Sequence, residues 1–245
     1  MRKPILIAVL VVVVAAIGLG VAVGVQLLRD DDPDLATEAP AIPIAGATGP
    51  DVAPTAAALT GSAPGPGVLR FVVDQSGSQV KYVVREKLAA LPVSSDAVGT
   101  TTSITGEIRL TPQGLAPDGQ SKFSVDLRTL ATDERRRDDW VRSNVLRTSQ
   151  FPTADFVVES LTGFPAGYVE GQEASMTMRG TLTVKGVSRP VEWTVKARRA
   201  GDTLTAIADT DFKMTDFGIT PPNVQLAKSE DGVHLQITLR AKLAA

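Results

Sequence analysis

Residues 179–196, RGTLTVKGVSRPVEWTVK, decide the class of fold. Apolar residues stand at every second position on either side of a break: Leu182, Val184, Val191, Trp193 and Val195. This alternation is typical of β-strands with one face toward a core and one toward water. Gly186 can adopt a positive φ and Pro190 lacks an amide donor, so we predict a short connection over residues 185–190, with pairing resuming at Val191. The stretch therefore predicts two antiparallel strands.

The same period of two recurs along most of the chain. Further candidate strands cover residues 68–74, 79–85, 104–110, 122–128, 154–161, 174–184, 191–197, 204–214 and 233–241. Eight or nine strands, joined by connections that carry Gly, Pro or Asp, favour an all-β fold, an up-and-down antiparallel barrel rather than a parallel α/β sheet.

One segment, residues 132–146, interrupts this pattern. It opens with Thr132 and acidic residues that suit a helix N-terminus, and Val141 and Val145 are spaced as neighbours on one helix face. We expect one short helix here, which plugs or flanks one end of the barrel.

Composition excludes several classes of function. The chain has no cysteine, which removes disulfides, thiolate catalysis, cysteine-based zinc sites and anchoring by a lipid-modified cysteine. Its 25 basic and 27 acidic residues give no basic field of the kind that nucleic-acid binding requires. Nucleic acid is therefore not an expected partner.

The N-terminus predicts a membrane anchor. Residues 5–25 are 21 residues without a polar side chain. As a helix rising about 1.5 Å per residue, this run crosses a hydrocarbon core of about 30 Å. Arg2 and Lys3 precede it and acidic residues follow, so the positive-inside rule places residue 1 in the cytoplasm. We expect a single-pass cell-membrane protein anchored by residues 1–28, with its remaining part extracytoplasmic.

Two further interpretations of this segment stay open. Residues 22–24 offer a cleavage site, so a cleaved signal peptide is the alternative to a retained anchor. The spacing of Gly20 and Gly24 lets two membrane helices approach closely, which leaves a homodimer open.

Residues 29–67 have the composition of a linker. They contain seven prolines and ten alanines in 39 residues, with no sustained period of two or 3.6. Such a sequence favours extended polyproline II and cannot form a core of its own. We expect a disordered Pro/Ala-rich spacer between the anchor and a globular domain over residues 68–245.

The globular part resembles the YceI-like family of lipid-binding proteins with a lipocalin-like barrel. The matching pieces are Asp74 with residues 78–84, Arg137 and Asp138 at the helix, Phe151 and Pro152 before Phe156, residues 180–191, and residues 211–219. The resemblance implies an exported bacterial cell-envelope protein that holds a polyisoprenoid, an isoprenoid quinone or a similar long-chain lipid. Gly77 and Arg85 stand where the family often carries histidine, which argues against a histidine-dependent headgroup contact.

The residues expected inside the barrel are apolar or aromatic. They are Val80, Tyr82, Val84, Ile104, Ile108, Phe123, Val125, Leu127, Phe156, Leu182, Val184, Trp193, Phe212 and Phe217. The same side chains suit either a packed core or the lining of a lipid tunnel, since burial of apolar surface stabilises both. The resemblance favours the tunnel, and Arg137 is then a candidate for a headgroup contact at its mouth.

Catalytic motifs are not found in the sequence. The one histidine, His234, is out of phase with the apolar residues around it and is expected to face water. With no second histidine and no cysteine, a nucleophilic triad has no other base. We expect a binding protein without catalytic residues, cofactor or metal. The alternatives are an enzyme that acts on such a lipid through carboxylates and a ligand-free structural module.

Overall fold

The computed structural model describes residues 35–42, 67–89, 93–118, 121–225 and 227–244. The expected anchor, residues 1–28, and most of the expected linker lie outside these ranges. Among the residues described, no helix has the length and apolar character needed to cross a membrane.

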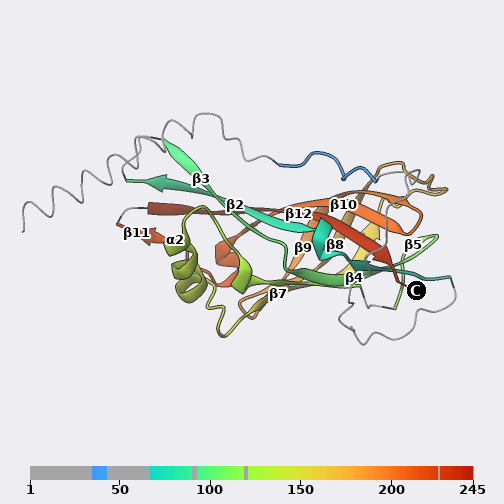
Figure 1. The fold of residues 1–245 in the computed structure, drawn as a ribbon. Helices are drawn as coiled ribbons and strands as arrows, with labels where there is room; N and C mark the ends of the chain where they lie inside the picture. The colour runs from blue at the N-terminus through green and yellow to red at the C-terminus, as the bar shows by residue number, and fades with distance from the viewer. Residues whose placement is uncertain (1–34, 43–66, 90–92, 119–120, 226, 245) are drawn as a thin grey trace, which may run out of the picture. The chain divides into compact units, whose positions relative to one another are not determined.

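The described chain forms one antiparallel sheet whose strands close into a barrel (Figure 1). Eight strands form the ring, in the order β1–β4–β6–β7–β8–β9–β10–β12, and β12 pairs back with β1. Their bounds are β1 Leu69–Val73, β4 Ile104–Thr111, β6 Lys122–Asp126, β7 Thr153–Thr162, β8 Ala174–Val184, β9 Val187–Ala200, β10 Thr203–Lys213 and β12 Ala227–Leu243. The predicted all-β antiparallel barrel is confirmed.

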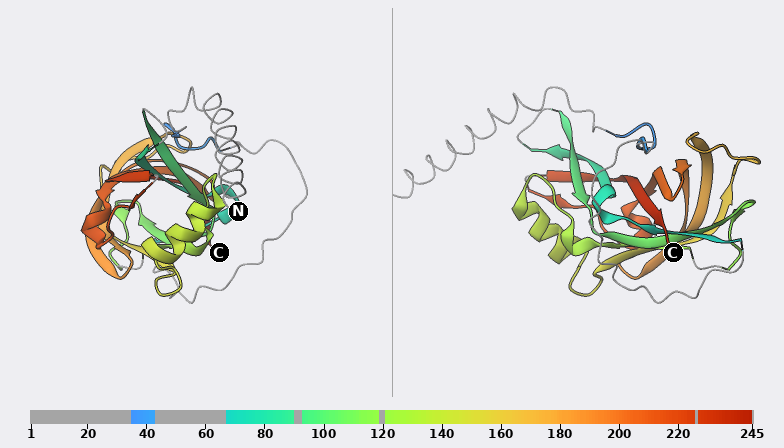
Figure 2. Two further views of the ribbon diagram at one scale, coloured as in Figure 1. Left: turned by 90° about the vertical axis from the view of Figure 1, so that its left-hand side faces the viewer. Right: turned by 45° about the vertical axis from the view of Figure 1, so that its right-hand side comes forward.

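The two ends of the barrel are built differently. At one end, the closed end, β1 pairs with both β4 and β12 and completes the ring. Toward the other end, β12 pairs instead with β2 (Gln79–Leu88), which pairs with β3 (Ser94–Thr101). Beyond β2, the described part of the chain gives β3 only one isolated bridge, from Thr100 to Ala131. Helix α2 (Arg135–Trp140) lies at this helical end (Figures 1 and 2).

The predicted short helix is confirmed. Helix α2 continues as a π-helical turn, η3 (Val141–Val145). The Glu134 side chain caps α2 by accepting from the Arg136 amide at 3.0 Å, and the Asp138 carboxylate accepts from the Thr132 amide and hydroxyl. The first bond satisfies a donor that a helix N-terminus leaves free, and the others tie the preceding segment to the helix. Three short 3₁₀ turns, η1 (Gln75–Gly77), η2 (Leu127–Thr129) and η4 (Met214–Phe217), and the two-residue strands β5 (Gly114–Leu115) and β11 (Asn223–Val224) complete the fold.

The β8–β9 hairpin is tighter than the sequence predicts. Lys185 and Gly186, with φ of 52° and 76°, form the turn, and β9 begins at Val187. Pro190 pairs with Thr181 inside the ladder, so the prediction that pairing resumes at Val191 is wrong. Strand β10 pairs with β9 only from Thr194 onward, so Pro190 lies where no ladder partner needs its missing amide.

Strand β3 was not predicted. Its inward positions, Ala97, Gly99 and Thr101, are too small to give a visible apolar alternation. Gly99 faces the ring of Tyr82, and a Cβ atom placed there would lie 2.2 Å from Tyr82 Cε1. Strand β3 therefore has small inward side chains because the Tyr82 ring occupies the space beside Gly99.

Residues 35–42 run along the outside of the barrel wall (Figure 2). Gln236 accepts from the Ala36 amide at 2.9 Å and donates to the Ala36 carbonyl at 3.0 Å. Thr205 donates to the Pro40 carbonyl, and the Ala39 amide donates to Glu173 while its side chain is 3% exposed. This part of the predicted spacer has no regular secondary structure but is bound to the barrel, which its composition did not predict.

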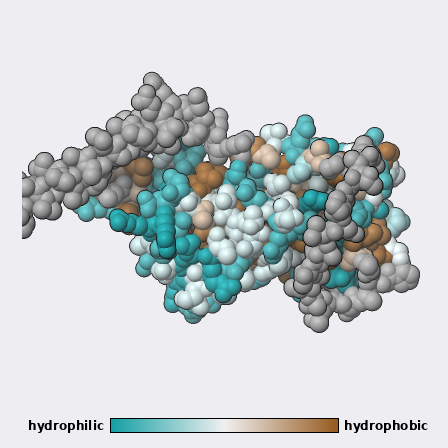
Figure 3. Space-filling model, in the orientation of Figure 1, coloured by the Kyte–Doolittle hydropathy of each residue, from teal (hydrophilic) through white to brown (hydrophobic). Residues whose placement is uncertain are grey.

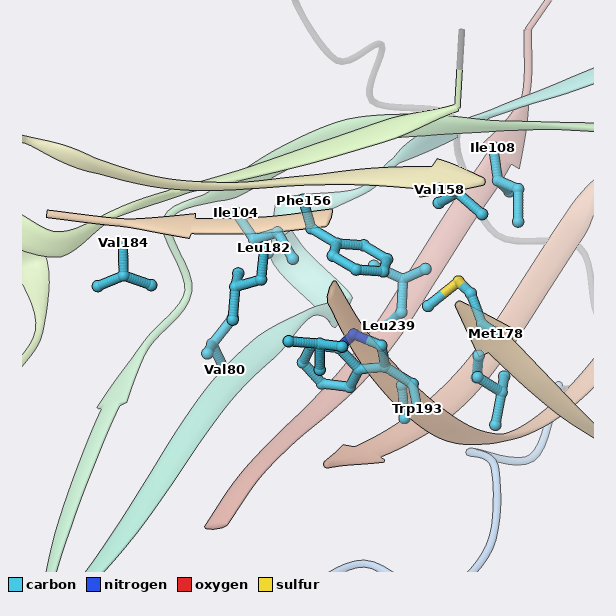
Figure 4. Packing of buried hydrophobic residues seen from close by; sticks show 14 of the residues in the cluster. Val80, Ile104, Ile108, Phe156, Val158, Met178, Leu182, Val184, Trp193 and Leu239 are labelled. Atoms are coloured by element: carbon cyan, nitrogen blue, oxygen red, sulfur yellow. The ribbon is translucent and has the colours of Figure 1, made fainter. Parts of the chain in front are cut away.

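The core lies inside the ring. Inward side chains of all eight ring strands form one apolar cluster, which includes Phe71, Phe156, Trp193 and Leu239 (Figure 4). The face shown in Figure 3 is mainly hydrophilic or intermediate in hydropathy, with scattered apolar patches. Most strands therefore show the expected inside-apolar, outside-polar alternation, whereas β10 is buried on both faces over residues 203–208.

Candidate ligand-binding site

The structure brings nearly all of the residues predicted to face the interior together. The buried members are Val80, Val84, Ile104, Ile108, Phe156, Leu182, Val184, Trp193 and Phe217. Half-buried members that pack against them are Tyr82, Phe123, Val125 and Phe212. Leu127 is buried but lies in η2, outside the strands and outside this cluster. The cross-strand pairs, such as Ile104 with Val125 and Phe156 with Leu182, confirm a shared inward face.

Several inward side chains toward the helical end keep part of their surface accessible. Tyr82 pairs with Leu235 across β2 and β12, and Phe123 and Val125 project inward from β6; all four are only half-buried. Protein interiors are packed as closely as organic crystals, so an inward side chain stays accessible only where neighbours do not fill the adjacent space. These four side chains therefore offer accessible apolar surface to a ligand, as half-buried Leu69 and Leu243 do toward the closed end.

Three aromatic rings lie against glycines of the barrel wall. A Cβ atom would lie 2.2 Å from Tyr82 at Gly99, 2.9 Å from the Phe123 ring at Gly106, and 2.7 Å from the Phe156 ring at Gly180. The glycines let these rings approach the backbone of the wall, where any other residue would collide with them. Rings held this way occupy less of the space across the barrel than rings that project toward its axis.

Trp193 carries an unpaired donor inside the barrel. Its side chain is 1% exposed, and the indole Nε1 has no hydrogen-bond partner among the residues described. The ring meets Phe156 edge to face, with centroids 5.6 Å apart (Figure 4). Leaving a buried donor without an acceptor costs about 1–3 kcal/mol. Nearly all buried polar groups in proteins are paired, so this atom calls for an explanation.

The helical end carries the charged groups of the site. Arg137 of α2 donates to the Glu86 carboxylate at 2.9 Å and also contacts Asp133 and the Thr132 hydroxyl. Glu86 is an inward position of β2, so this ion pair holds α2 against the strand. Burial raises the pKa of Glu86 above its ordinary value, and the positive charge of Arg137 offsets this only in part. A headgroup contact of Arg137 stays a prediction.

Tyr82 is a neutral donor on the same side. Burial raises the pKa of its hydroxyl to about 12, with the nearby Arg137 charge acting in the opposite direction. The hydroxyl therefore keeps its proton throughout the neutral range and can donate to an oxygen acceptor.

Sequence reasoning left out several residues of the interior. Leu235 and Ile237 continue the inward face of β12, and Ala97 and Gly99 form that of β3. For β12 the signal was available, since residues 233–241 have the period of two. For β3 it was not, because the inward side chains are small.

His234 lies outside the barrel, as predicted from its phase. Its Nδ1 is 3.0 Å from an Asp211 oxygen and its Nε2 is 3.4 Å from Asp209, so it contacts two carboxylates of β10. In the part of the chain that the structure describes, no group of three or more His, Asp or Glu side chains is arranged to hold a metal ion.

Comparison with known proteins identifies relatives of this barrel. A family profile described as YceI-like domain matches residues 71–241. BcnA of Burkholderia cenocepacia superposes with a TM-score of 0.54 at 22% identity, over 69% of this chain and 99% of BcnA. A polyisoprenoid binding domain from Saccharophagus degradans, implicated in plant cell wall breakdown, gives 0.56 at 16% identity, over 72% and 99% of the two chains.

The YceI protein of Campylobacter jejuni superposes with a TM-score of 0.52 at 16% identity, over 65% of this chain and 91% of its own. Comparison with curated proteins gives no match. At these identities the likeness to solved structures is a likeness of fold.

Proposed function

This chain belongs to the YceI-like family, and on that premise we propose that its barrel binds a long-chain apolar lipid, a polyisoprenoid or a lipid of similar shape, and sequesters or transfers it. One observation carries the proposal: apolar side chains that point into the ring, Tyr82, Phe123, Val125 and Leu235, remain half-buried. The solved barrel from Saccharophagus degradans, a polyisoprenoid binding domain, supports the ligand class.

The interior suits such a ligand energetically. Each methylene group moved from water to an apolar site contributes about 0.8 kcal/mol, so a long hydrocarbon needs few polar contacts to bind. The wall offers valine, leucine, isoleucine and aromatic side chains. Binding of this kind involves no covalent step.

The same proposal includes the location of the protein. The apolar run over residues 5–25, with basic residues before it and acidic residues after it, supports a membrane anchor with the barrel outside the cytoplasm. A barrel tethered in this way belongs to the same membrane as the long-chain lipids that it would bind. The anchor thus complements a function in lipid sequestration or transfer.

A pair of matched substitutions tests the proposal. Val125→Trp adds bulk to the half-buried inward face, whereas Val157→Trp makes the same change at an outward position of β7 that is exposed. The lipid that co-purifies with each full-length variant is extracted, and the amount of lipid per mole of protein is measured. We expect Val125→Trp to lose the lipid and Val157→Trp to keep it.

The free energy of unfolding of Val125→Trp distinguishes a ligand-binding interior from a filled core. Added bulk in a filled core costs about 1–3 kcal/mol, whereas added bulk in unfilled space costs little. A strongly destabilised Val125→Trp variant, together with a wild-type protein free of lipid, would instead indicate a ligand-free structural barrel.

A further inference from the structure

The sheet carries exposed apolar side chains where it extends past the ring of strands. Leu88 of β2 pairs with Ala227 of β12, and Ala227 pairs with Val224 of β11, so these three residues form one cross-strand row. Val93 directly precedes β3 and is 66% exposed, and Val224 is 47% exposed. We call these four residues the apolar lip. It belongs to the helical end, where β11 and α2 lie (Figure 1).

An exposed tryptophan lies at the same end. Trp140, the last residue of α2, is 40% exposed. It follows Arg137 by about one helical turn, and Arg137 binds Glu86, which lies on the same face of β2 as Leu88. The apolar lip and Trp140 therefore flank one ion pair. Single exposed apolar residues are ordinary on a protein surface, but a group of them marks a place where a partner can bind.

A pair of lysines lies next to the apolar lip. Lys87 and Lys228 are directly opposite each other in the β2–β12 ladder, one position from the pair of Leu88 and Ala227. Both lysines are exposed, and within the described ranges neither forms an ion pair. Like charges directly opposite each other destabilise a ladder, and a negatively charged partner would relieve this repulsion.

The exposed arginines of α2 add to the positive charge of the helical end. Arg135 and Arg136 are exposed, and neither has an ion-pair partner in the part of the chain that the structure describes. The acidic residues of this segment are already engaged, in ion pairs or in hydrogen bonds to backbone amides: Asp133, Glu134, Asp138 and Asp139. The two arginines can therefore contact an external anion.

An anionic lipid bilayer fits this surface better than a second copy of the chain does. Its phosphates would meet the lysines and arginines, and the boundary between its headgroups and acyl chains accepts tryptophan and valine side chains. A second copy, related by a two-fold axis, would bring the same lysines face to face, where like charges repel.

We propose that the helical end of the barrel docks on an anionic membrane surface through the apolar lip, Trp140, Lys87 and Lys228. This inference goes beyond the proposed lipid-binding function, because the docking needs no ligand in the interior. It also differs from the proposed N-terminal anchor, which would hold the chain at a membrane without orienting the barrel.

Single fluorescent labels test the orientation. The chain has no cysteine, so Val224→Cys and Val169→Cys each give one site for an environment-sensitive fluorophore. Val169 is 55% exposed and belongs to the closed end, where the amide of Gly171 donates to the carbonyl of Arg199 in β9. The labelled full chain is reconstituted into nanodiscs of phosphatidylcholine, with or without phosphatidylglycerol. A quencher attached to the lipid then measures how close each label lies to the bilayer.

We expect quenching at residue 224 in anionic nanodiscs and none at residue 169. Lys87→Gln should lower the ratio of docked to undocked protein about fivefold, the factor that corresponds to about 1 kcal/mol per basic residue near an anionic surface. Lys122→Gln, at an exposed position of β6, is the matched control and should leave this ratio unchanged. Lys87→Glu places an acid opposite Lys228, so it should abolish docking without lowering the free energy of unfolding.

Three results would overturn the inference. Equal quenching at residues 224 and 169 would show that the barrel has no preferred orientation at the membrane. Quenching at residue 224 that is as strong in neutral nanodiscs, or that survives Lys87→Glu, would show that the lysines do not hold a membrane. A label at residue 224 that responds to protein concentration and not to lipid would assign the apolar lip to a second copy. A barrel that docks but carries no lipid would contradict only the proposed function.

Discussion

The two ends of the barrel show what a closed ring of strands does to its interior. At the closed end, β1 completes the ring, Phe71 is 0% exposed, and the Arg199 guanidinium lies 5.7 Å from the centre of its ring. At the helical end, β3 has within the described residues one bridge beyond its pairing with β2, and inward residues such as Tyr82 and Val125 are half-buried. The two ends thus differ in strand pairing and in cover, whereas both combine fully buried and half-buried inward side chains, such as Phe71 and Leu243 at the closed end.

Fully buried and half-buried inward residues are expected to differ in what they contribute. Fully buried residues such as Phe71 supply stability, because buried apolar side chains and their contacts favour the folded state. Half-buried inward residues such as Tyr82 and Val125 contribute less to stability and can contact a ligand. The account therefore predicts that substitutions at the closed end mainly affect folding, and that those at the helical end mainly affect binding.

The largest expected effect comes from removing the core ring at the closed end. Phe71→Ala should lower the free energy of unfolding by about 3–5 kcal/mol, because it leaves a cavity among fully buried neighbours. Phe123→Ala, at a half-buried position, should cost roughly half of that or less. Urea denaturation of both variants measures the difference. Equal losses would mean that the two ends are equally filled.

Removing an arginine should likewise cost more stability at the closed end, at Arg109, than at the helical end, at Arg137. Arg109 at the closed end is 1% exposed and donates to Glu107 at 2.8 Å and Asp118 at 2.9 Å. Arg109→Ala should destabilise by at most about 3–5 kcal/mol, since Glu107 keeps Arg70 as a cationic partner while Asp118 loses its bond to Arg109. Arg137→Ala should cost less, about 1–3 kcal/mol.

Hydrogen exchange gives this comparison a local measure. Arg137→Ala should speed amide exchange in residues 132–145 and leave β1 protected, because the Arg137–Glu86 pair holds only α2. Faster exchange of β1 in this variant would contradict the separation of the two ends.

The smallest expected effect concerns pH. Burial raises the pKa of Glu107 at the closed end, but hydrogen bonds from Arg70 and Arg109 outweigh it and hold the pKa below the ordinary 4.5. Its stabilisation is present above that value and is lost as pH falls through the folded-state pKa. Glu86 at the helical end has a raised pKa, so its contribution is present below 4.5 and is lost as pH rises through the folded-state pKa.

Glutamine substitutions isolate these opposite slopes. The destabilisation of Glu107→Gln relative to wild type should shrink below pH 4.5. The free energy of unfolding of Glu86→Gln should rise relative to that of wild type as pH rises above 4.5. Chemical denaturation across this range measures both. Slopes of the same sign would show that the two carboxylates do not have opposite environments.

Alternation predicted the barrel well because large apolar residues mark the inward face of most strands. Val191, Trp193 and Val195 illustrate this, since all three are buried members of the core. The short helix was also predicted, from Thr132 and the spacing of Val141 and Val145. The candidate lining followed from the same alternation, and the structure brings all of it except Leu127 of η2 into one apolar cluster; its contact with a ligand stays a prediction.

Other features depend on contacts that a period of two does not encode. Strand β3 has small inward residues because the Tyr82 ring lies against Gly99. Residues 35–42 bind the barrel through backbone groups that meet outward side chains such as Gln236 and Thr205. The unpaired Nε1 of Trp193 is likewise a property of three-dimensional surroundings, since alternation predicts only that the side chain points inward.

Native mass spectrometry of the purified full chain shows whether the barrel carries a lipid. We expect a protein mass increased by that of one long-chain lipid, and organic extraction should release an apolar molecule of the same mass. Val125→Trp should show the mass of the polypeptide alone. A wild-type protein whose mass is that of the polypeptide alone, and which takes up no long-chain lipid when one is added, would contradict the claim that the barrel is a lipid-binding site.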